Sequence, residues 1–544
     1  MTSFNLLEEQ WVPCLPLAGA EVQELSLRSV LLRSHEMREI SDASPLVVVA
    51  LHRLLLAVLH RVFGPATQGE WKALRDNGSV PADRVDAYLD KWHHRFDLFD
   101  PVRPFYQTSE IDFSYATGSI ARLSHEAGPN NAQMFSHTDN PAYSPAKAAR
   151  SLVAWLSFGA PGLVGFEEGD AKNRSASGAP LAPLAVSLVR GETLFDTLLL
   201  NLVRYDPHDE VPFATQGADL PAWERVDQPK PVQRLPTGYL DLLTWQSRRI
   251  RLLPEADRDG GTVVKRTAHM KGFQFPSGYE RRGRETMAAF RRNEKAKPGQ
   301  EPWPPLALRP ERAVWRDSLS LFQSTENVRK RPSTLGWLAA LMESGALLPQ
   351  QILPLDVFGL HWDQANVLFW RHERLPLPLA YLEEADLQAG LTRALEVAEE
   401  IGAILRQATR RTARLVLSPD LAGEGREPPA EAVSDLANRL ASARLYWSRL
   451  EARFSKFLVD QAEDTRPGAN AEESAYGSGP LMTWARHARA AARESFREAV
   501  SGLDQSGRNL KAVVEGERLL NSRMAQLWKK DELSERKEES IATV

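Results

Sequence analysis

The sequence predicts an α+β fold, in which a large irregular mixed N-terminal domain over residues 1–370 is followed by a C-terminal antiparallel four-helix bundle over residues 375–544. Two observations support this division. Short strand-like apolar stretches alternate with helical patterns up to about Arg374, whereas apolar residues recur every three or four positions from Leu375 onward. With 544 residues, 43% of them hydrophobic, the chain can bury at least one large core.

The N-terminal part mixes predicted strands with predicted helices. Strands are expected over 21–27 and 183–189, and helices over 45–63 and 145–158. The first of these helices contains four polar residues, His52, Arg53, His60 and Arg61. Histidine and arginine are costly in hydrocarbon, so we expect a buried helix rather than a membrane span.

Four amphipathic stretches fill the C-terminal part. Their apolar stripes run over 387–405, 436–457, 481–496 and 510–527. Prolines and glycines lie between them, as is typical of the breaks between helices. Each stripe must be buried against another, and four antiparallel helices in one bundle achieve this most simply.

Positive charge is concentrated between Arg248 and Arg331. This region has 20 Lys and Arg against 10 Asp and Glu, a net +10, and the whole chain carries −4, so the remainder carries −14. The overall charge does not suggest a free-standing nucleic-acid binder, because neutralising phosphates requires a concentrated positive surface. The distribution is typical of a protein that touches nucleic acid on one face, and a solvated basic loop is the alternative.

The sequence contains no common catalytic motif. It has no phosphate-binding Gly-Lys-Ser/Thr loop, no nucleophile elbow, and no histidine pair spaced for a metal with a nearby acid. The single cysteine, Cys14, excludes an intrachain disulfide and a multi-cysteine zinc site. The sequence therefore predicts no catalytic residue, no metal and no cofactor. We expect a cytoplasmic protein without membrane contact.

A series of unusual strings carries a family resemblance. In chain order they are Asn5–Pro13, Phe99–Gln107, Ala160–Gly165, Leu188–Gly191 with Leu198–Asn201, and Gly238–Tyr239 through Trp245–Gln246 to Arg249–Ile250. Each string is weak evidence alone. Their collinear order over about 370 residues, followed by a helical bundle, resembles the CasA-type large subunit of the type I-E CRISPR Cascade surveillance complex.

The resemblance implies a function in antiviral defence. Members of this family recognise the protospacer-adjacent motif in double-stranded DNA, mainly through the minor groove, and promote strand separation and R-loop formation. The minor groove presents a degenerate pattern, so a backbone-rich reader there tolerates related motifs. The implied partners are the target DNA, the 5′ handle of the guide RNA, and the backbone, small and handle-binding subunits of Cascade. A separate, recruited helicase-nuclease performs the cleavage, so this chain is not itself expected to be an enzyme.

The resemblance also implies where DNA is read. The family's glycine loop corresponds to Gly162, Leu163, Val164 and Gly165, and a lysine that enters the same groove corresponds to Lys271. Glycines allow a backbone to approach bases closely, although without the resemblance an ordinary turn is the favoured explanation of this loop. Five arginines are alternatives to the lysine, with phosphate-contacting or solvated roles favoured for most of them: Arg281, Arg282, Arg284, Arg291 and Arg292.

Two further elements follow from the same resemblance. The strand-separating wedge corresponds to Gln364, Ala365 and Asn366, where this sequence has alanine in place of a glutamine, so the amide comes from Gln364 or Asn366. A docking loop for the guide RNA and a neighbouring subunit is expected to use Asn131, Gln133, Met134 and Phe135. In the bundle, a group of arginines is available for the displaced strand: Arg406, Arg410, Arg411 and Arg414.

Two other readings remain open on the sequence. The chain can be a nuclease or RNA-processing enzyme whose carboxylates are not recognisable from their spacing. It can also be a purely structural docking subunit, with the basic region serving as solvated surface.

Overall fold

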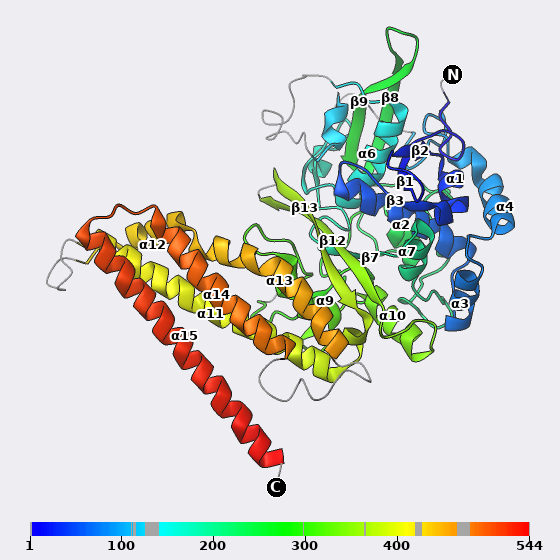
Figure 1. Ribbon diagram of the computed structural model, residues 1–544. Coiled ribbons are helices and arrows are strands. Elements are labelled where there is room, and N and C mark those ends of the chain that lie inside the picture. The colour runs from blue at the N-terminus through cyan, green and yellow to red at the C-terminus, as the bar shows by residue number, and fades with distance from the viewer. Residues whose placement is uncertain are drawn as a thin grey trace. The chain divides into compact units, whose positions relative to one another are not determined.

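Two compact units make up the chain, residues Met1–Leu382 and Glu383–Val544. The computed structural model describes residues 3–109, 111, 116–125, 141–297, 299–363, 366–418, 427–464 and 479–542, with side chains as far as residue 527 (Figure 1). The N-terminal unit extends beyond the expected boundary at 370–375, because strand β13 (Asn366–Pro378) pairs along its whole length with β12 (Ile352–Asp363).

Small antiparallel sheets are the framework of the N-terminal unit. Within the described residues, three three-stranded sheets have the orders β2-β1-β3, β13-β12-β7 and β4-β9-β8, and two-stranded sheets join β5 to β6 and β10 to β11. The remaining strands are β1 (Val12–Pro16), β2 (Gln23–Leu25), β3 (Met37–Ile40), β4 (Thr117–Ser119), β5 (Gly162–Leu163), β6 (Ser175–Ala176), β7 (Val186–Val189), β8 (Arg248–Ala256), β9 (Thr262–Lys271), β10 (Phe290–Arg291) and β11 (Arg329–Lys330). The strands expected over 21–27 and 183–189 correspond to β2 and β7.

Helices pack around these sheets. They are α1 (Leu27–Leu32), α2 (Pro45–Val62), α3 (Gln68–Asp76), α4 (Ala82–Trp92), α6 (Pro145–Phe158), α7 (Leu194–Leu200), α8 (Tyr239–Leu243), α9 (Ser318–Phe322) and α10 (Ser333–Glu343). The helices expected over 45–63 and 145–158 are α2 and α6. Each begins with a proline in its first turn, where the missing N–H costs nothing, and the Ser144 side chain caps α6 by accepting from the Lys147 amide.

Helix α2 is the centre of the N-terminal core. Its length and apolarity are those of a membrane span, but 83% of it is buried inside the unit, as is usual for a core helix. It packs against α6 and contributes to one large apolar cluster with the β12–β7 sheet. That cluster includes Leu46, Val49, Phe158, Leu188, Phe358 and Leu360. The sheet and α6 are therefore fixed to the same core.

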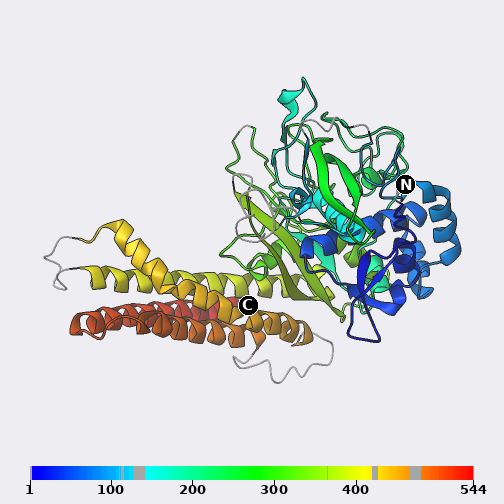
Figure 2. The same ribbon diagram turned by 90° about the horizontal axis from the view of Figure 1, so that it is seen from above.

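The C-terminal unit consists of helices throughout its described residues. They are α11 (Ala385–Leu417), α12 (Ala430–Leu440), α13 (Ser442–Asp464), α14 (Pro480–Ser501) and α15 (Gly507–Ala542), and the long ones run antiparallel beside one another (Figure 2). The second predicted stretch is divided into α12 and α13, because Ala441 has a φ of 55°, which no right-handed helix accommodates. Five helices therefore stand in place of the four expected.

Close packing links the long helices. Tyr446 donates from its hydroxyl to the Ala398 carbonyl at 2.9 Å, and the Trp484 indole donates to the Ala394 carbonyl at 2.8 Å. Helices α11 and α15 approach so closely that a Cβ on Gly516 would collide with Thr412 and lie 2.7 Å from the Phe496 ring. Most of the apolar stripes read from the sequence are thus buried against one another, whereas Leu510 is exposed and α12, with Leu436 and Leu440, has no buried residue.

Four buried histidines make the stability of the N-terminal unit depend on pH. Burial lowers the pKa of His52 to about 3, of His60 and His125 to about 4, and of His269 well below its usual value. The unfolded chain binds protons at these rings below about pH 6.5, whereas the folded chain stays neutral there. The stability contributed by the four neutral histidines is therefore fully present above pH 6.5. It is lost as the pH falls toward their pKa values in the folded state.

We expect the thermal midpoint of the N-terminal unit to decrease when the pH is lowered from 7.5 to 5.5. In the His60→Gln variant, one fewer proton is taken up on unfolding. The slope of the free energy of unfolding against pH should therefore be smaller, by roughly 1.4 kcal/mol per pH unit at most. His208→Asn is the control, because His208 is exposed. A dependence in His60→Gln as steep as in the unsubstituted protein would contradict the assignment.

Candidate nucleic-acid interface

The glycine loop is a short strand anchored at both ends. Gly162 has a φ of +152°, a conformation that other residues rarely adopt, and β5 pairs with β6 through Gly162–Ala176 and Leu163–Ser175. The Val164 amide donates to the Arg174 carbonyl at 2.8 Å, and the Gly165 amide donates to the His269 carbonyl at 2.9 Å. Leu163, at the centre of the loop, is 71% exposed. The loop therefore presents the Leu163 side chain to solvent, whereas Gly162 is half-buried and Gly165 is buried.

Lys271 lies beside the end of this loop. It is the last residue of β9, and its neighbour Met270 forms a parallel bridge with Gly165. The Arg249 guanidinium fixes the Lys271 carbonyl at 2.9 Å. Gly272 follows where the backbone passes so closely that a Cβ would lie 2.6 Å from the Gln246 carbonyl oxygen. The position of Lys271 is therefore set by backbone contacts on both sides, and within the described residues its ammonium has no partner.

The β12–β13 hairpin ends close to the same loop. Trp362 pairs with Val367, Asp363 pairs with Asn366, and the Trp362 ring packs beside Ala160 against the large apolar cluster. A Cβ built on Gly178 would lie 3.6 Å from Pro161 and 3.9 Å from the Trp362 ring. The residue just before the glycine loop and the end of the hairpin thus border the same small space.

Arg248 holds the backbone around the loop. It is 1% exposed, and its guanidinium donates to the carbonyls of Ser247 at 3.0 Å, Ala160 at 3.0 Å and Ser177 at 2.7 Å. Burial lowers the pKa of Arg248 to about 10, so the group is still charged at neutral pH. One cation therefore ties β8 to the segments before β5 and after β6.

His269 supports the loop from behind. Its ring nitrogen Nε2 lies 3.0 Å from the Trp155 indole nitrogen, so the neutral imidazole accepts a hydrogen bond from α6. Burial, followed by the charges of Arg248 and Arg122, lowers the pKa of His269 and keeps it neutral. The same residue's carbonyl accepts from Gly165.

The structure brings together three of the predicted elements on the N-terminal unit. Two elements distant in sequence meet the loop segment: Met270, next to Lys271, bridges to Gly165, and Trp362, at the end of the hairpin, lies near Gly178 and Pro161. Other predicted residues lie outside the described residues: Gln364, Ala365, Asn131, Gln133, Met134 and Phe135. The side chain of Asn366 is outside them as well.

The basic side chains of the central region are of two kinds, those held by contacts within the fold and those without a side-chain partner. Arg281 and Arg282 pair with Glu301 and Glu280, and Arg284 lies over the Tyr279 ring, so these three stabilise the fold. The exposed residues gather on the β10–β11 ribbon, where Arg291 pairs in register with Arg329. The ribbon cations, which have no side-chain partner among the described residues, are Arg291, Arg292, Lys295, Lys297, Arg329 and Lys330.

Sequence reasoning missed the residues that support the site. Arg248 appeared only as one charge in a basic region, and neither His269 nor Trp362 was assigned to the loop. The available signal was a Trp-Gln-Ser-Arg-Arg string, whose adjacent arginines begin strand β8. It gives no indication that Arg248 is buried. In the part of the chain that the structure describes, no group of three or more His, Cys, Asp or Glu residues is placed to hold a metal ion.

Comparisons with known proteins place these features in one family. The sequence profile described as CRISPR-associated protein Cse1 matches residues 5–495. The CRISPR-associated protein CasA/Cse1 of Thermus thermophilus is 33% identical over 531 residues, which are 95% of this chain and 96% of that protein. The crystal structure of Cse1 from Acidimicrobium ferrooxidans is 28% identical, with a TM-score of 0.80, and covers 97% of this chain and 98% of its own.

A further structure has the same fold. A chain in a CRISPR RNA-guided surveillance complex is 22% identical, with a TM-score of 0.74 over 96% of this chain and all of its own.

We expect the Arg248→Lys variant to loosen the glycine loop. A lysine keeps the charge, but its single nitrogen cannot hold carbonyls as the guanidinium fork does. The free energy of unfolding should fall by about 2–4 kcal/mol. Hydrogen exchange at the Val164 and Gly165 amides should accelerate, and Arg266→Lys, on the exposed side of β9, is the matched control. Unchanged protection at both amides would show that Arg248 does not anchor the loop.

Proposed function

Because this chain belongs to the CRISPR-associated Cse1 family, we propose that it is the large subunit of a type I-E Cascade complex and recognises the protospacer-adjacent motif in double-stranded DNA. In this proposal it reads the motif mainly through the minor groove and promotes strand separation and R-loop formation. A separate helicase-nuclease, which it recruits, cleaves the target. The chain acts in the cytoplasm with the guide RNA and the other Cascade subunits.

The observation that carries the proposal is the convergence of the glycine loop, Lys271 and the β12–β13 hairpin. The minor groove is narrow and shows few distinguishing groups, so a reader needs close backbone approach and a slender cation. The glycine loop Gly162–Gly165 provides the backbone, with the buried Gly165 fixing its end, and Lys271 provides the cation. Leu163, exposed at the centre of the loop, is of the apolar type that minor-groove proteins press against base steps.

The hairpin is suited to separating strands beside such a reader. Its core end is fixed, since twelve residue pairs join β12 to β13 and Trp362 packs against the large apolar cluster. A rigid two-stranded support lets a polar tip enter the duplex without the support bending away. We assign the wedge to Gln364, Ala365 and Asn366, with the amide of Gln364 or Asn366 replacing a base contact.

Further contacts complete the proposal. The ribbon cations neutralise phosphates of the duplex next to the motif, without reading sequence. Asn131, Gln133, Met134 and Phe135 dock on the guide RNA handle and a neighbouring subunit. In the bundle, Arg406, Arg410 and Arg411 are exposed for the displaced strand, whereas Arg414 forms an ion pair with Glu427.

The decisive experiment measures DNA binding by the reconstituted RNA-guided complex with and without this chain, on duplexes that differ only in the adjacent motif. Gly165→Asp and the double variant Gln364→Ala/Asn366→Ala should weaken motif-dependent binding more than tenfold while assembly is retained, because each good base contact is worth about 1–3 kcal/mol.

Gly217→Asp is the matched control for the glycine substitution. Gly217 is exposed, with no atom within 4 Å of an added Cβ, so it receives the same charge at a glycine outside the glycine loop. If motif preference persists in the complex without this chain, the chain is a scaffold and the reader assignment is wrong.

A second experiment addresses the ribbon cations. We expect Arg291→Ala/Arg292→Ala to reduce the slope of log affinity against log salt by about 1–2, with motif preference unchanged, because each lost phosphate contact releases about one counterion fewer. Arg38→Ala/Arg258→Ala removes two exposed arginines from other strands and turns and should leave the slope unchanged. An altered motif preference in the ribbon variant would show base reading instead.

A further inference from the structure

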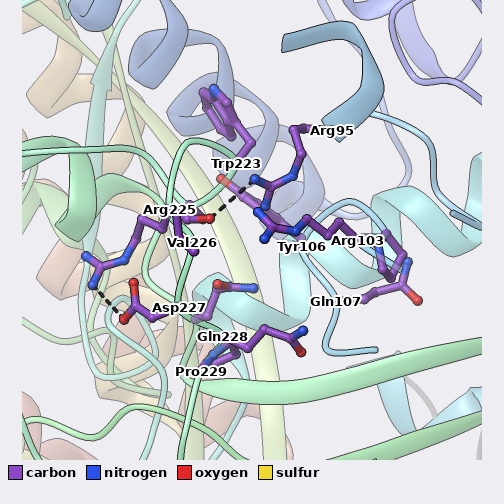
Figure 3. Close-up of a pocket in the computed structure, with 13 residues that line it drawn as sticks. Arg95, Arg103, Tyr106, Gln107, Trp223, Arg225, Val226, Asp227, Gln228 and Pro229 are labelled. Atoms are coloured by element: carbon purple, nitrogen blue, oxygen red, sulfur yellow. Dashed lines mark hydrogen bonds and ion pairs between the residues drawn. The ribbon is translucent and has the colours of Figure 1, made fainter. Parts of the chain in front are cut away.

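A small arginine-rich pocket lies in the N-terminal unit. It forms between the segment that follows helix α4 and the segment 222–229, as Figure 3 shows. Its polar lining comes mainly from seven side chains, one of them a carboxylate that pairs with Arg225: Arg95, Arg103, Gln107, Arg225, Asp227, Gln228 and Gln246. We call this the arginine pocket. The proposed DNA-reading residues contribute nothing to it.

Two of its guanidinium groups have no carboxylate partner among the described residues. Arg95 donates only to the Arg225 carbonyl, at 3.3 Å, and its Nε is buried without a hydrogen-bond partner. Arg103 has no side-chain hydrogen bond or ion pair within the part of the chain that the structure describes. Figure 3 shows both groups directed toward the same space. Arg225, in contrast, pairs with Asp227 and Asp241, each at 3.1 Å.

This arrangement is costly for the isolated chain. Burial, and then the charge of Arg103, lower the pKa of Arg95, with Asp100 opposing them. The Asp100 carboxylate is already engaged by the backbone amides of Val102 at 2.8 Å and Arg103 at 2.6 Å. Two like charges held together with a buried unpaired N–H bond are stabilised when an anion binds between them.

The dimensions and the rim indicate which anion fits. The hollow is about 30 Å³, room for two or three water-sized groups, which suits one carboxylate but not a nucleotide base. Its aromatic residues, Tyr106 and Trp223, are buried and stack on each other at 6.0 Å, so no base can stack on them. Val102 and Val226 beside it are 65% and 77% exposed. Exposed apolar residues beside half-buried polar groups are typical of the rim of a protein interface.

We propose that the arginine pocket is a docking site for an acidic side chain, aspartate or glutamate, from another protein subunit of the surveillance complex. The carboxylate binds between Arg95 and Arg103, and apolar residues next to it in the partner cover Val102 and Val226. This inference rests on the proposed function, because it places the contact within that complex. It adds a second attachment surface, separate from the expected docking loop.

The first test measures how tightly the full chain joins the remainder of the complex, assembled with guide RNA and without DNA. The Arg95→Ala/Arg103→Ala variant should bind roughly tenfold more weakly or worse, because it removes both cations that hold the carboxylate, the half-buried Arg95 and the exposed Arg103. Its thermal midpoint should stay unchanged or rise, because the variant loses an unpaired charge. The Arg38→Ala/Arg258→Ala variant is the control and should bind normally.

The second test identifies the class of partner. Val226 is replaced by p-benzoylphenylalanine, and the assembled complex is irradiated; Val22, 49% exposed elsewhere, receives the same group as a control. A protein adduct at Val226 that is lost in the double arginine variant supports the proposal. A nuclease-sensitive RNA adduct, or no adduct above the control, overturns it.

The outcomes separate the two proposals. If the unsubstituted chain does not join the complex, the proposed function fails and this inference fails with it. If the unsubstituted chain and the double arginine variant join equally well, only the arginine pocket is wrong. A fall in the thermal midpoint of the variant that accounts for the weaker binding would show a structural role and also overturn the proposal.

Discussion

The guanidinium of Arg248 fixes the backbone on which the proposed reader is built. Loop carbonyls near Ala160 and Ser177 have no strand partner at those positions, and a buried carbonyl must find a donor. A planar cation with several N–H groups can satisfy carbonyls from separate segments at once, which a backbone ladder cannot do here. The glycine loop can therefore carry flexible residues and still hold one position.

The arginines of the N-terminal unit illustrate how differently one residue type is used. Arg248 is buried and donates to three carbonyls, Arg282 lies 4.2 Å from the centre of the Trp303 ring, and Arg95 is partly buried and donates to a single carbonyl. A charge count treats all of them as equal contributions to a basic surface. Their surroundings show that only some are available to phosphate or to a partner's carboxylate.

The sequence was sufficient to predict features that depend on local chemistry. Helices α2 and α6 follow from proline and serine at their starts and from continuous apolar faces, and the long C-terminal helices follow from their stripes. The break at Ala441 was not predictable, because alanine favours helices and only packing forces a positive φ on it. The convergence of Gly165 with Met270 and of Pro161 with Trp362 depends on contacts between residues far apart in the chain, which periodicity does not report.

The four neutral histidines have a consequence for calorimetry. Near pH 6, unfolding of the N-terminal unit transfers protons from the solution to rings that were uncharged inside it. The buffer supplies those protons and releases or absorbs its own heat of ionisation. The apparent enthalpy of unfolding at this pH therefore includes the ionisation enthalpy of the buffer. It differs between phosphate and an amine buffer even when the transition of the protein is the same.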